Sequence, residues 1–228
     1  TAPILTQLGG RFPLAACEHV AVLYRGGEAA FRWSSFLAEG LEHQDLCLYL
    51  APRAFHEPML ERIRAQGADP DAHVRSGTLR LHEGLKDSRD LQQQAQQVFA
   101  DAEDLRAPAV RWLEEGSWPE AIGFPMEQFF EFQAILNYQV KHYPSVALCQ
   151  FDLEATEPHH LFSAIAVHRH LIVEETLVRD NPFYIPAEKF IPLSPQDRER
   201  DVVELFRQVG FDVEKLLAAL AGFGRLRS

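Results

Sequence analysis

Apolar and polar positions follow two different periods along this chain. Five short runs are almost entirely apolar, as strands covered on both faces of a sheet are, and they lie at Val20–Tyr24, Leu46–Ala51, Thr78–His82, Val110–Leu113 and Val146–Phe151. Between these runs the apolar residues recur at helical spacing, which predicts helices over Glu28–Leu41, Phe55–Gln66, Ser88–Asp104 and Met126–His142. Strands that each lead into a helix usually pair in parallel. The pattern therefore predicts a three-layer α/β fold, with a mostly parallel sheet between two layers of helices.

The two ends of the chain depart from this alternation. Residues 1–18 are expected to form an irregular lead-in. The C-terminal part predicts a helix over Leu161–His168, short β pieces at Leu171–Val173 and Thr176–Arg179, and an extended segment at Asn181–Pro186. Two further apolar stripes follow a helix start at Ser194 and are separated at Gly210, which predicts a helical hairpin. We therefore expect an α/β domain over residues 1–190 and a helical appendage over residues 191–228.

Composition narrows the class of partner. The chain has 228 residues, 46% of them hydrophobic, which is typical of a globular protein. Its net charge of -11 argues against direct binding to nucleic acid or to an anionic membrane, since both require clustered Lys and Arg. No apolar run approaches the roughly 18 residues of a membrane-spanning helix. The three cysteines are far apart and two lie in apolar runs, so we expect free thiols and a cytoplasmic location.

The turn after the first predicted strand has the layout of a nucleotide-binding loop without its catalytic residues. Tyr24-Arg25-Gly26-Gly27 follows an apolar strand and precedes a helix whose N-terminus is suited to an anion. No Gly-Lys-Ser/Thr sequence closes the loop, and an NTPase needs that Lys and hydroxyl for the phosphates and Mg²⁺. The sequence thus favours sensing over catalysis, and we assign no catalytic residue.

The order of several short motifs resembles one family. The segments are His19-Val-Ala-Val-Leu-Tyr24, Phe36-Leu-Ala-Glu-Gly-Leu41, Leu148-Cys-Gln-Phe-Asp152 and Asn181-Pro-Phe-Tyr-Ile-Pro186, together with Asn137 and His168. Over roughly residues 19–190 the chain is similar to the MEDS domain, a methanogen and methylotroph sensory module first described in a dichloromethane-responsive regulator. The resemblance implies a RecA/KaiC-like fold without a standard Walker A motif, and a prokaryotic sensor of small molecules coupled to an output domain. The ends of this chain carry no recognisable output domain, and Arg169 stands where the family suggests a Pro.

Candidate ligand-binding residues follow the strands, because open parallel sheets bind ligands beyond their carboxyl ends. After the first strand come Tyr24, Arg25, Gly26 and Gly27, and Arg25 is suited to an anionic group. The other candidates are Arg53 after the second strand, Glu114 and Trp118 after the fourth, and Asp152 after the fifth. Each has a plainer interpretation as a solvated loop residue or, for Asp152, as a helix cap.

We predict no metal site. His159, His160, His168 and His170 give four imidazoles in twelve residues, but no Cys or carboxylate falls at the spacing usual for metal sites. Structural or surface histidines are expected instead, and Cys149 in mid-strand is expected to be inert. The cofactor, if any, is unknown.

The sequence thus predicts a sensory domain that binds a small molecule at the strand ends and regulates a signalling or transcription protein. The movable element would be Asn181–Pro186 with the helices behind it, and self-association is possible. Two alternatives stay open. One is a divergent RecA/KaiC-type ATPase using Glu114 and Asp152, and the other is a ligand-free module that regulates a sigma factor or a kinase.

Overall fold

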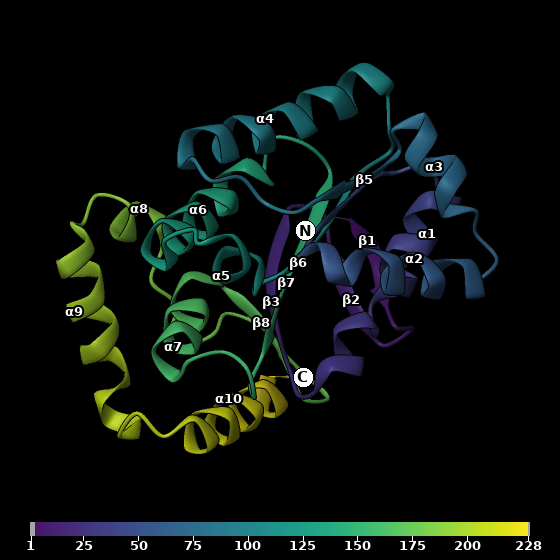
Figure 1. The fold of residues 1–228 in the computed structure, drawn as a ribbon. Coiled ribbons are helices and arrows are strands. Elements are labelled where there is room, and N and C mark those ends of the chain that lie inside the picture. Colours follow the sequence, from purple (N-terminus) through teal and green to yellow (C-terminus); the bar gives the residue numbers. More distant parts are fainter. Residues whose placement is uncertain (1–2, 228) are drawn as a thin grey trace.

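A seven-stranded sheet forms the centre of the computed structural model, which describes residues 3–227 (Figure 1). The strands lie in the order β5-β4-β6-β7-β3-β8-β9, and all neighbours are parallel except β9, which runs antiparallel to β8. Their bounds are β3 (Glu18–Tyr24), β4 (Leu46–Leu50), β5 (Leu79–His82), β6 (Val110–Glu115), β7 (Ser145–Asp152), β8 (His170–Val173) and β9 (Thr176–Val178). The central strands are buried on both sides, as their apolar runs predict.

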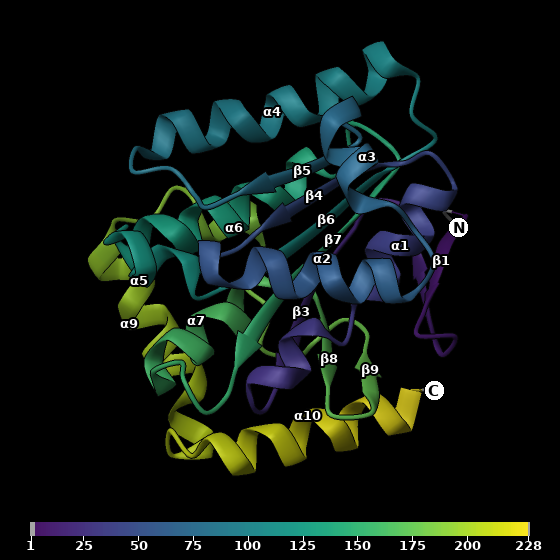
Figure 2. The same cartoon turned by 45° about the vertical axis from the view of Figure 1, so that its right-hand side comes forward.

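One face of the sheet is covered by the first helices and by a two-stranded hairpin (Figure 2). The helices are the 3₁₀ helix η1 (Gly27–Phe31), α1 (Ser34–Glu42), η2 (Arg53–Phe55) and α2 (His56–Ala65). A short helix that the sequence analysis did not foresee, α3 (Pro70–Ser76), leads from α2 into the edge strand β5. Asp69 caps it by accepting a hydrogen bond from the amide of Ala72.

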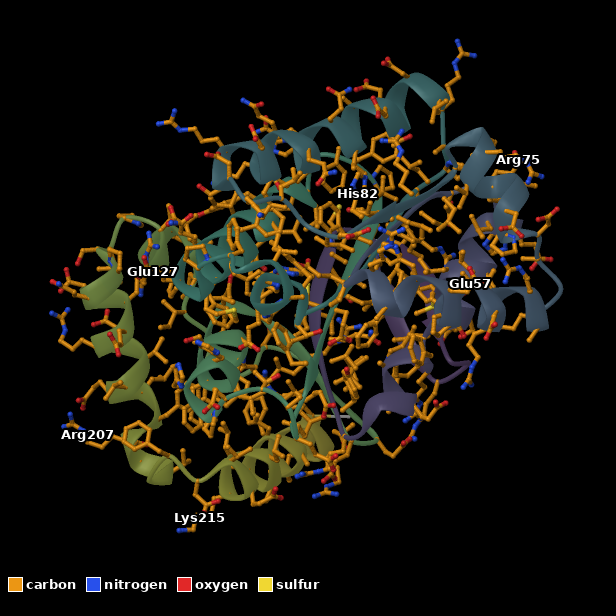
Figure 3. The ribbon with its side chains drawn as sticks, in the orientation of Figure 1. Glu57, Arg75, His82, Glu127, Arg207 and Lys215 are labelled. Carbon is orange, nitrogen blue, oxygen red and sulfur yellow. The ribbon has the colours of Figure 1, made fainter. Side chains whose placement is uncertain are left out.

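The opposite face carries the larger hydrophobic core and the remaining helices. These are α4 (Ser88–Leu105), α5 (Trp118–Ile122), α6 (Met126–Gln139), α7 (Pro158–Val167), α8 (Ala187–Phe190), α9 (Pro195–Phe206), η3 (Arg207–Val209) and α10 (Val213–Arg227). Charged side chains such as Arg207 and Lys215 project outward from this layer (Figure 3). The predicted three-layer α/β fold is confirmed.

The irregular lead-in predicted for residues 1–18 is wrong over most of its described length. Strands β1 (Ile4–Leu8) and β2 (Phe12–Ala15) pair in an antiparallel hairpin. Leu8, Phe12 and Leu14 are buried against α1 and its neighbours, so this hairpin is part of the core. The alternation of apolar and polar residues is too short here to predict strands from the sequence. An isolated two-stranded hairpin is only marginally stable, and its packing against the helices supplies the stability that it lacks alone.

The helix predicted over Glu28–Leu41 is broken in two. The carbonyl of Ala30 accepts a hydrogen bond from the side-chain amide of Gln150 on β7, at 3.0 Å. In a continuous α-helix that carbonyl would pair with an amide four residues on. The contact with the sheet replaces this bond, and the chain forms η1 before α1 begins at Ser34.

The two predicted C-terminal helices form, but they do not make a hairpin. Helix α9 packs against α7, whereas α10 lies along β9, and the two enclose an angle (Figure 1). They are joined through η3 and Gly210, whose φ of 65° a glycine adopts without strain. A Cβ at Gly224 would lie 2.6 Å from the methyl group of Thr176, so α10 approaches β9 closely at this residue. Each apolar stripe is therefore buried against the α/β core rather than against the other stripe.

Candidate functional site

A polar cluster lies at the carboxyl ends of the central strands. It contains two of the predicted residues, Tyr24 and Asp152, and Glu115, the neighbour of the predicted Glu114. The hydroxyl of Tyr24 on β3 donates to Oε2 of Glu115 on β6 at 3.0 Å. Asp152, at the end of β7, accepts hydrogen bonds from the amides of Gly26 and Glu154. We call Tyr24, Glu115 and Asp152 the carboxyl-end cluster. It lies where the connections after β3 and β7 leave for opposite faces of the sheet, the usual position of a ligand site in such folds.

Burial changes the protonation of Glu115. Its side chain is almost fully buried, and desolvation raises its pKa to about 8, against the smaller lowering effect of the hydrogen bond from Tyr24. The negative charge of Asp152 contributes to this increase in the pKa. Nearby, the Tyr49 hydroxyl and the Oε1 atom of Gln150 are buried without a hydrogen-bond partner among the described residues. The cluster therefore offers a protonated carboxyl group and unused polar atoms.

The glycine turn after β3 is engaged with other parts of the protein. Gly26 has a φ of 81°, and its amide faces Asp152, so it is not directed at a free anion. Gly27 is exposed at the start of η1. Arg25 is exposed and pairs with Glu214 on α10, with 2.5 Å between Nη2 and Oε1. The turn predicted to bind a ligand thus contacts the C-terminal helix.

Glu114 and Trp118 lie together, but inside the core on the face opposite Glu115. Strand β6 continues through Glu115, two residues beyond the predicted end, and this places Glu114 in the sheet. Its carboxylate accepts hydrogen bonds from the indoles of Trp112 and Trp118 and from the amide of Gln133, at 2.7–3.0 Å. Burial raises the pKa of Glu114, while these donors lower it. Arg53, by contrast, has a side chain that is 86% exposed, and its Nε lies 3.9 Å from Oε1 of Glu83.

A pocket that the sequence analysis did not predict lies between α6, α7 and α9. Its volume is about 470 Å³, and most of its walls are apolar. Phe130 comes from α6, Phe162 from α7 and Val202 from α9, with Arg198 at its polar side. Glu127, labelled in Figure 3, lies at its edge between α6 and α9. Helix α7 follows the carboxyl end of β7, and α6 follows that of β6 after the short helix α5, so the pocket lies near the expected edge of the sheet. Periodicity marks such aromatic residues as core and gives no sign that a space separates them.

Three potential metal ligands from distant segments also meet in the core. They are His19 on β3, Cys149 on β7 and His168 at the end of α7, and their ligand atoms all lie within 4.8 Å of one another. His159 is exposed, and the ring of His160 lies tilted against that of Phe130 and near Glu120. The four-histidine run therefore does not assemble as one site, and the only member of it that joins this group is His168.

Comparison with protein-family models matches residues 18–169 to the MEDS domain, described as the methanogen/methylotroph, DcmR sensory domain. The match covers about two thirds of the chain, so the chain belongs to the MEDS family. A search among curated proteins finds no match. Along residues 3–227, none of the helices combines the length and the apolarity needed to cross a bilayer.

Proposed function

From this family membership we propose that the chain is a sensor that binds a small organic molecule in the pocket between α6, α7 and α9. One observation carries the proposal: the walls of the pocket are shared between the α/β core and α9. The volume of about 470 Å³ lies within the usual range for small-molecule sites. The apolar lining favours a molecule with one or two polar atoms, which Arg198 and His159 are placed to orient.

A ligand in this pocket would favour the docked position of α9. A ligand shifts an equilibrium only by binding one state better than the other, and a molecule that touches both α7 and α9 binds best when they are packed together. The segment at Asn181–Pro186 joins this motion to the core, because Phe183 stacks on Phe206 of α9 at 5.1 Å between ring centroids. The output would be the surface of α9 and α10, presented to a signalling or transcription protein or to a second copy of the chain.

A second position for the ligand is the carboxyl-end cluster, as the sequence analysis expects from Tyr24, Arg25, Gly26, Gly27 and Asp152. The unpartnered polar atoms of Tyr49 and Gln150 favour a polar molecule there. The Arg25–Glu214 ion pair would carry its effect to α10. The alternative of a divergent ATPase places ATP at the same turn, so ATP with Mg²⁺ is the probe that separates it from the pocket.

Thermal unfolding in the presence of small molecules tests the proposal. The probes are dichloromethane, a series of aliphatic and aromatic alcohols, and ATP with and without Mg²⁺. A ligand at 100 times its dissociation constant adds about 2.7 kcal/mol to the free energy of unfolding. We expect stabilisation by an organic probe, and none by ATP.

A pocket-filling variant locates the site. Val203 lines the pocket and is 41% exposed, whereas Val74 on α3 is 40% exposed and lies elsewhere. Val203→Trp should abolish the stabilisation by the organic probe, and Val74→Trp should leave it unchanged. Stabilisation that survives Val203→Trp but is lost in Tyr24→Phe would move the site to the carboxyl-end cluster. Slower hydrogen exchange of the α9 amides on binding would support transmission, and unchanged exchange would contradict it.

A further inference from the structure

The group of His19, Cys149 and His168, which we call the His–Cys cluster, contains more acceptors of hydrogen bonds than donors. Its members are almost fully buried, at 3%, 0% and 0% exposure. Nε2 of His19 lies 3.0 Å from Nε2 of His168 and 3.2 Å from the sulfur of Cys149. Which of these atoms carries hydrogen follows from their surroundings.

The surroundings of His19 place its hydrogen on Nδ1. The side-chain amide of Asn137 donates to the carbonyls of Gln133, Ala134 and Val167 at 3.0–3.3 Å. This fixes the amide orientation and turns the Asn137 oxygen towards Nδ1 of His19, at 3.2 Å. An amide oxygen only accepts, so Nδ1 donates.

His168 has its hydrogen on Nδ1 as well, because this nitrogen faces the carbonyl oxygen of Ala164 at 2.7 Å. In the neutral rings each Nε2 then carries a lone pair, and the two lone pairs face one another across 3.0 Å. Such a contact is repulsive unless a cation lies between the nitrogens.

The thiol cannot supply the missing hydrogens. Gln133 donates through Nε2 to the carboxylate of Glu114, and its oxygen therefore faces the sulfur of Cys149, at 3.0 Å. The single S–H hydrogen thus has three acceptors, Gln133 Oε1, His19 Nε2 and, at 3.6 Å, Glu114 Oε2. His168 Nε2 has no donor from either ring or thiol. One cation among these atoms would satisfy all of them.

We propose that His19, Cys149 and His168 bind one Zn²⁺-class transition-metal ion, with the oxygen of Gln133 available as a fourth ligand. Imidazole nitrogen and thiolate sulfur are the ligands such ions prefer. Zinc bonds of about 2.0–2.3 Å place tetrahedral ligand atoms roughly 3.3–3.7 Å apart. The separations of 3.0 and 3.2 Å need only a few tenths of an ångström of expansion.

Two features outside the ligands support this site. Metal-bound histidines usually donate their other ring N–H to a carbonyl or carboxylate, as His168 does to Ala164 and His19 to Asn137. The buried carboxylate of Glu114 lies 3.6 Å from the Cys149 sulfur and has no cationic partner among the described ion pairs. When the ion binds, the thiol proton leaves to solvent, and the charges of a divalent ion, the thiolate and Glu114 sum to zero.

An entry route is present. A pocket of about 570 Å³ at the amino end of β3 is lined by His19 and Asn137, with Glu18, Lys141 and Asp180 among its polar walls. This pocket brings solvent to one side of His19, the ligand of the three that is not completely buried. The site is separate from the pocket between α6, α7 and α9, and it stands whether or not the proposed function is correct.

Titration of the chelator-treated full chain with Co²⁺ and Zn²⁺ tests the site. We expect one equivalent of Co²⁺ to produce a thiolate-to-cobalt charge-transfer band and tetrahedral d–d bands, and one equivalent of Zn²⁺ to displace it. Cys149→Ser should abolish the charge-transfer band. Cys47→Ser is the matched control, because Cys47 is also a fully buried thiol in the sheet, and it should keep the band.

Loss of the band in Cys149→Ser could also result from misfolding, so a second variant changes a residue that is not a ligand. Glu114→Gln keeps the shape of the side chain and removes its charge. It should weaken Zn²⁺ binding by about 10–100-fold, as changes to groups that hydrogen-bond to metal ligands do. Absence of stoichiometric binding to the folded wild-type chain, or a charge-transfer band that persists in Cys149→Ser, would overturn the proposal. Tight binding of Cu⁺ with no binding of Zn²⁺ or Co²⁺ would also overturn the assignment of the metal class.

Discussion

The two faces of the sheet each bury a polar cluster, and only one of the clusters contains its own counter-charge. Beside α1, the guanidinium of Arg111 is 1% exposed and bonds to Asp45 at 2.7 Å and to Glu39 at 3.0 Å. It also donates to the carbonyl of Phe36. On the other face, the His–Cys cluster and Glu114 hold a carboxylate, a thiol and two imidazole lone pairs, and none of them meets a cationic side chain in the described structure.

We attribute this difference to the roles of the two clusters, a structural ion pair at Arg111 and the proposed metal site at Cys149. Burial lowers the pKa of Arg111, but the hydrogen bonds that its guanidinium donates to Glu39 and Asp45 outweigh this effect. The net change in pKa is an increase, so the positive charge is stably held. Gly40 on α1 makes room for this side chain, since a Cβ there would lie 2.5 Å from Cδ of Arg111. The packing around Arg111 is complete. Around Cys149 the polar atoms are ordered, but no cationic side chain of the described residues pairs with them.

The largest expected effect comes from breaking the complete cluster. Arg111→Met leaves the Asp45 carboxylate buried and unpaired, and removing one partner of a buried ion pair costs about 3–5 kcal/mol. Urea unfolding measures this loss. Arg80→Met is the control: Arg80 pairs with Asp101 at 2.6 Å, but both side chains are about a quarter exposed, so the loss should stay below about 1 kcal/mol. Equal losses in the two variants would show that the Arg111 pair is not effectively buried.

The incomplete cluster should instead be stabilised by an added ion. Zn²⁺ at a free concentration 100 times its dissociation constant should raise the free energy of unfolding by about 2.7 kcal/mol. The same increment is expected in Arg80→Met, and none in Cys149→Ser. An increment that is equal in all three proteins would indicate binding at surface sites and would remove the contrast between the two clusters.

The carboxyl-end cluster should make the free energy of unfolding depend on pH. The pKa of Glu115 is about 8 in the folded protein, above its ordinary value, so the folded state holds a proton that the unfolded chain releases. Its contribution to stability is therefore present below the unfolded pKa and is lost as the pH rises towards about 8. We expect the free energy of unfolding to fall between pH 5 and 8 by an amount on the order of a few kcal/mol. Glu115→Gln should flatten this slope, and an unchanged slope would show that other groups cause it.

The smallest effect is expected at the surface. Arg25 and Glu214 are 43% and 73% exposed, and exposed ion pairs contribute about 0–1 kcal/mol. Arg25→Ala should therefore change the free energy of unfolding by less than about 1 kcal/mol. A larger loss would show that this pair helps to hold α10 against the core.

Alternation of apolar strands with helices was sufficient to predict the central sheet. Strand β4, at Leu46–Leu50, and helix α4, at Ser88–Leu105, lie within one residue of their predicted bounds. Both predictions depend only on residues close together in the sequence, namely an unbroken apolar run and a helical period. The break between η1 and α1 was not predictable in this way. It depends on the hydrogen bond from Gln150, which lies 120 residues further along the chain.

The sequence by itself therefore determined the fold class, the family and the strand ends at which to look for ligands. Only the tertiary structure decided how polar side chains are grouped. Tyr24 and Asp152 lie together with Glu115, which the sequence analysis did not single out. Glu114, which it did single out, lies on the other face because side chains alternate along β6. His19, Cys149 and His168 have no motif spacing, since parallel pairing of β3 with β7 and β8 brings them together. Local patterns record which residues are buried, and long-range pairing decides which of them meet.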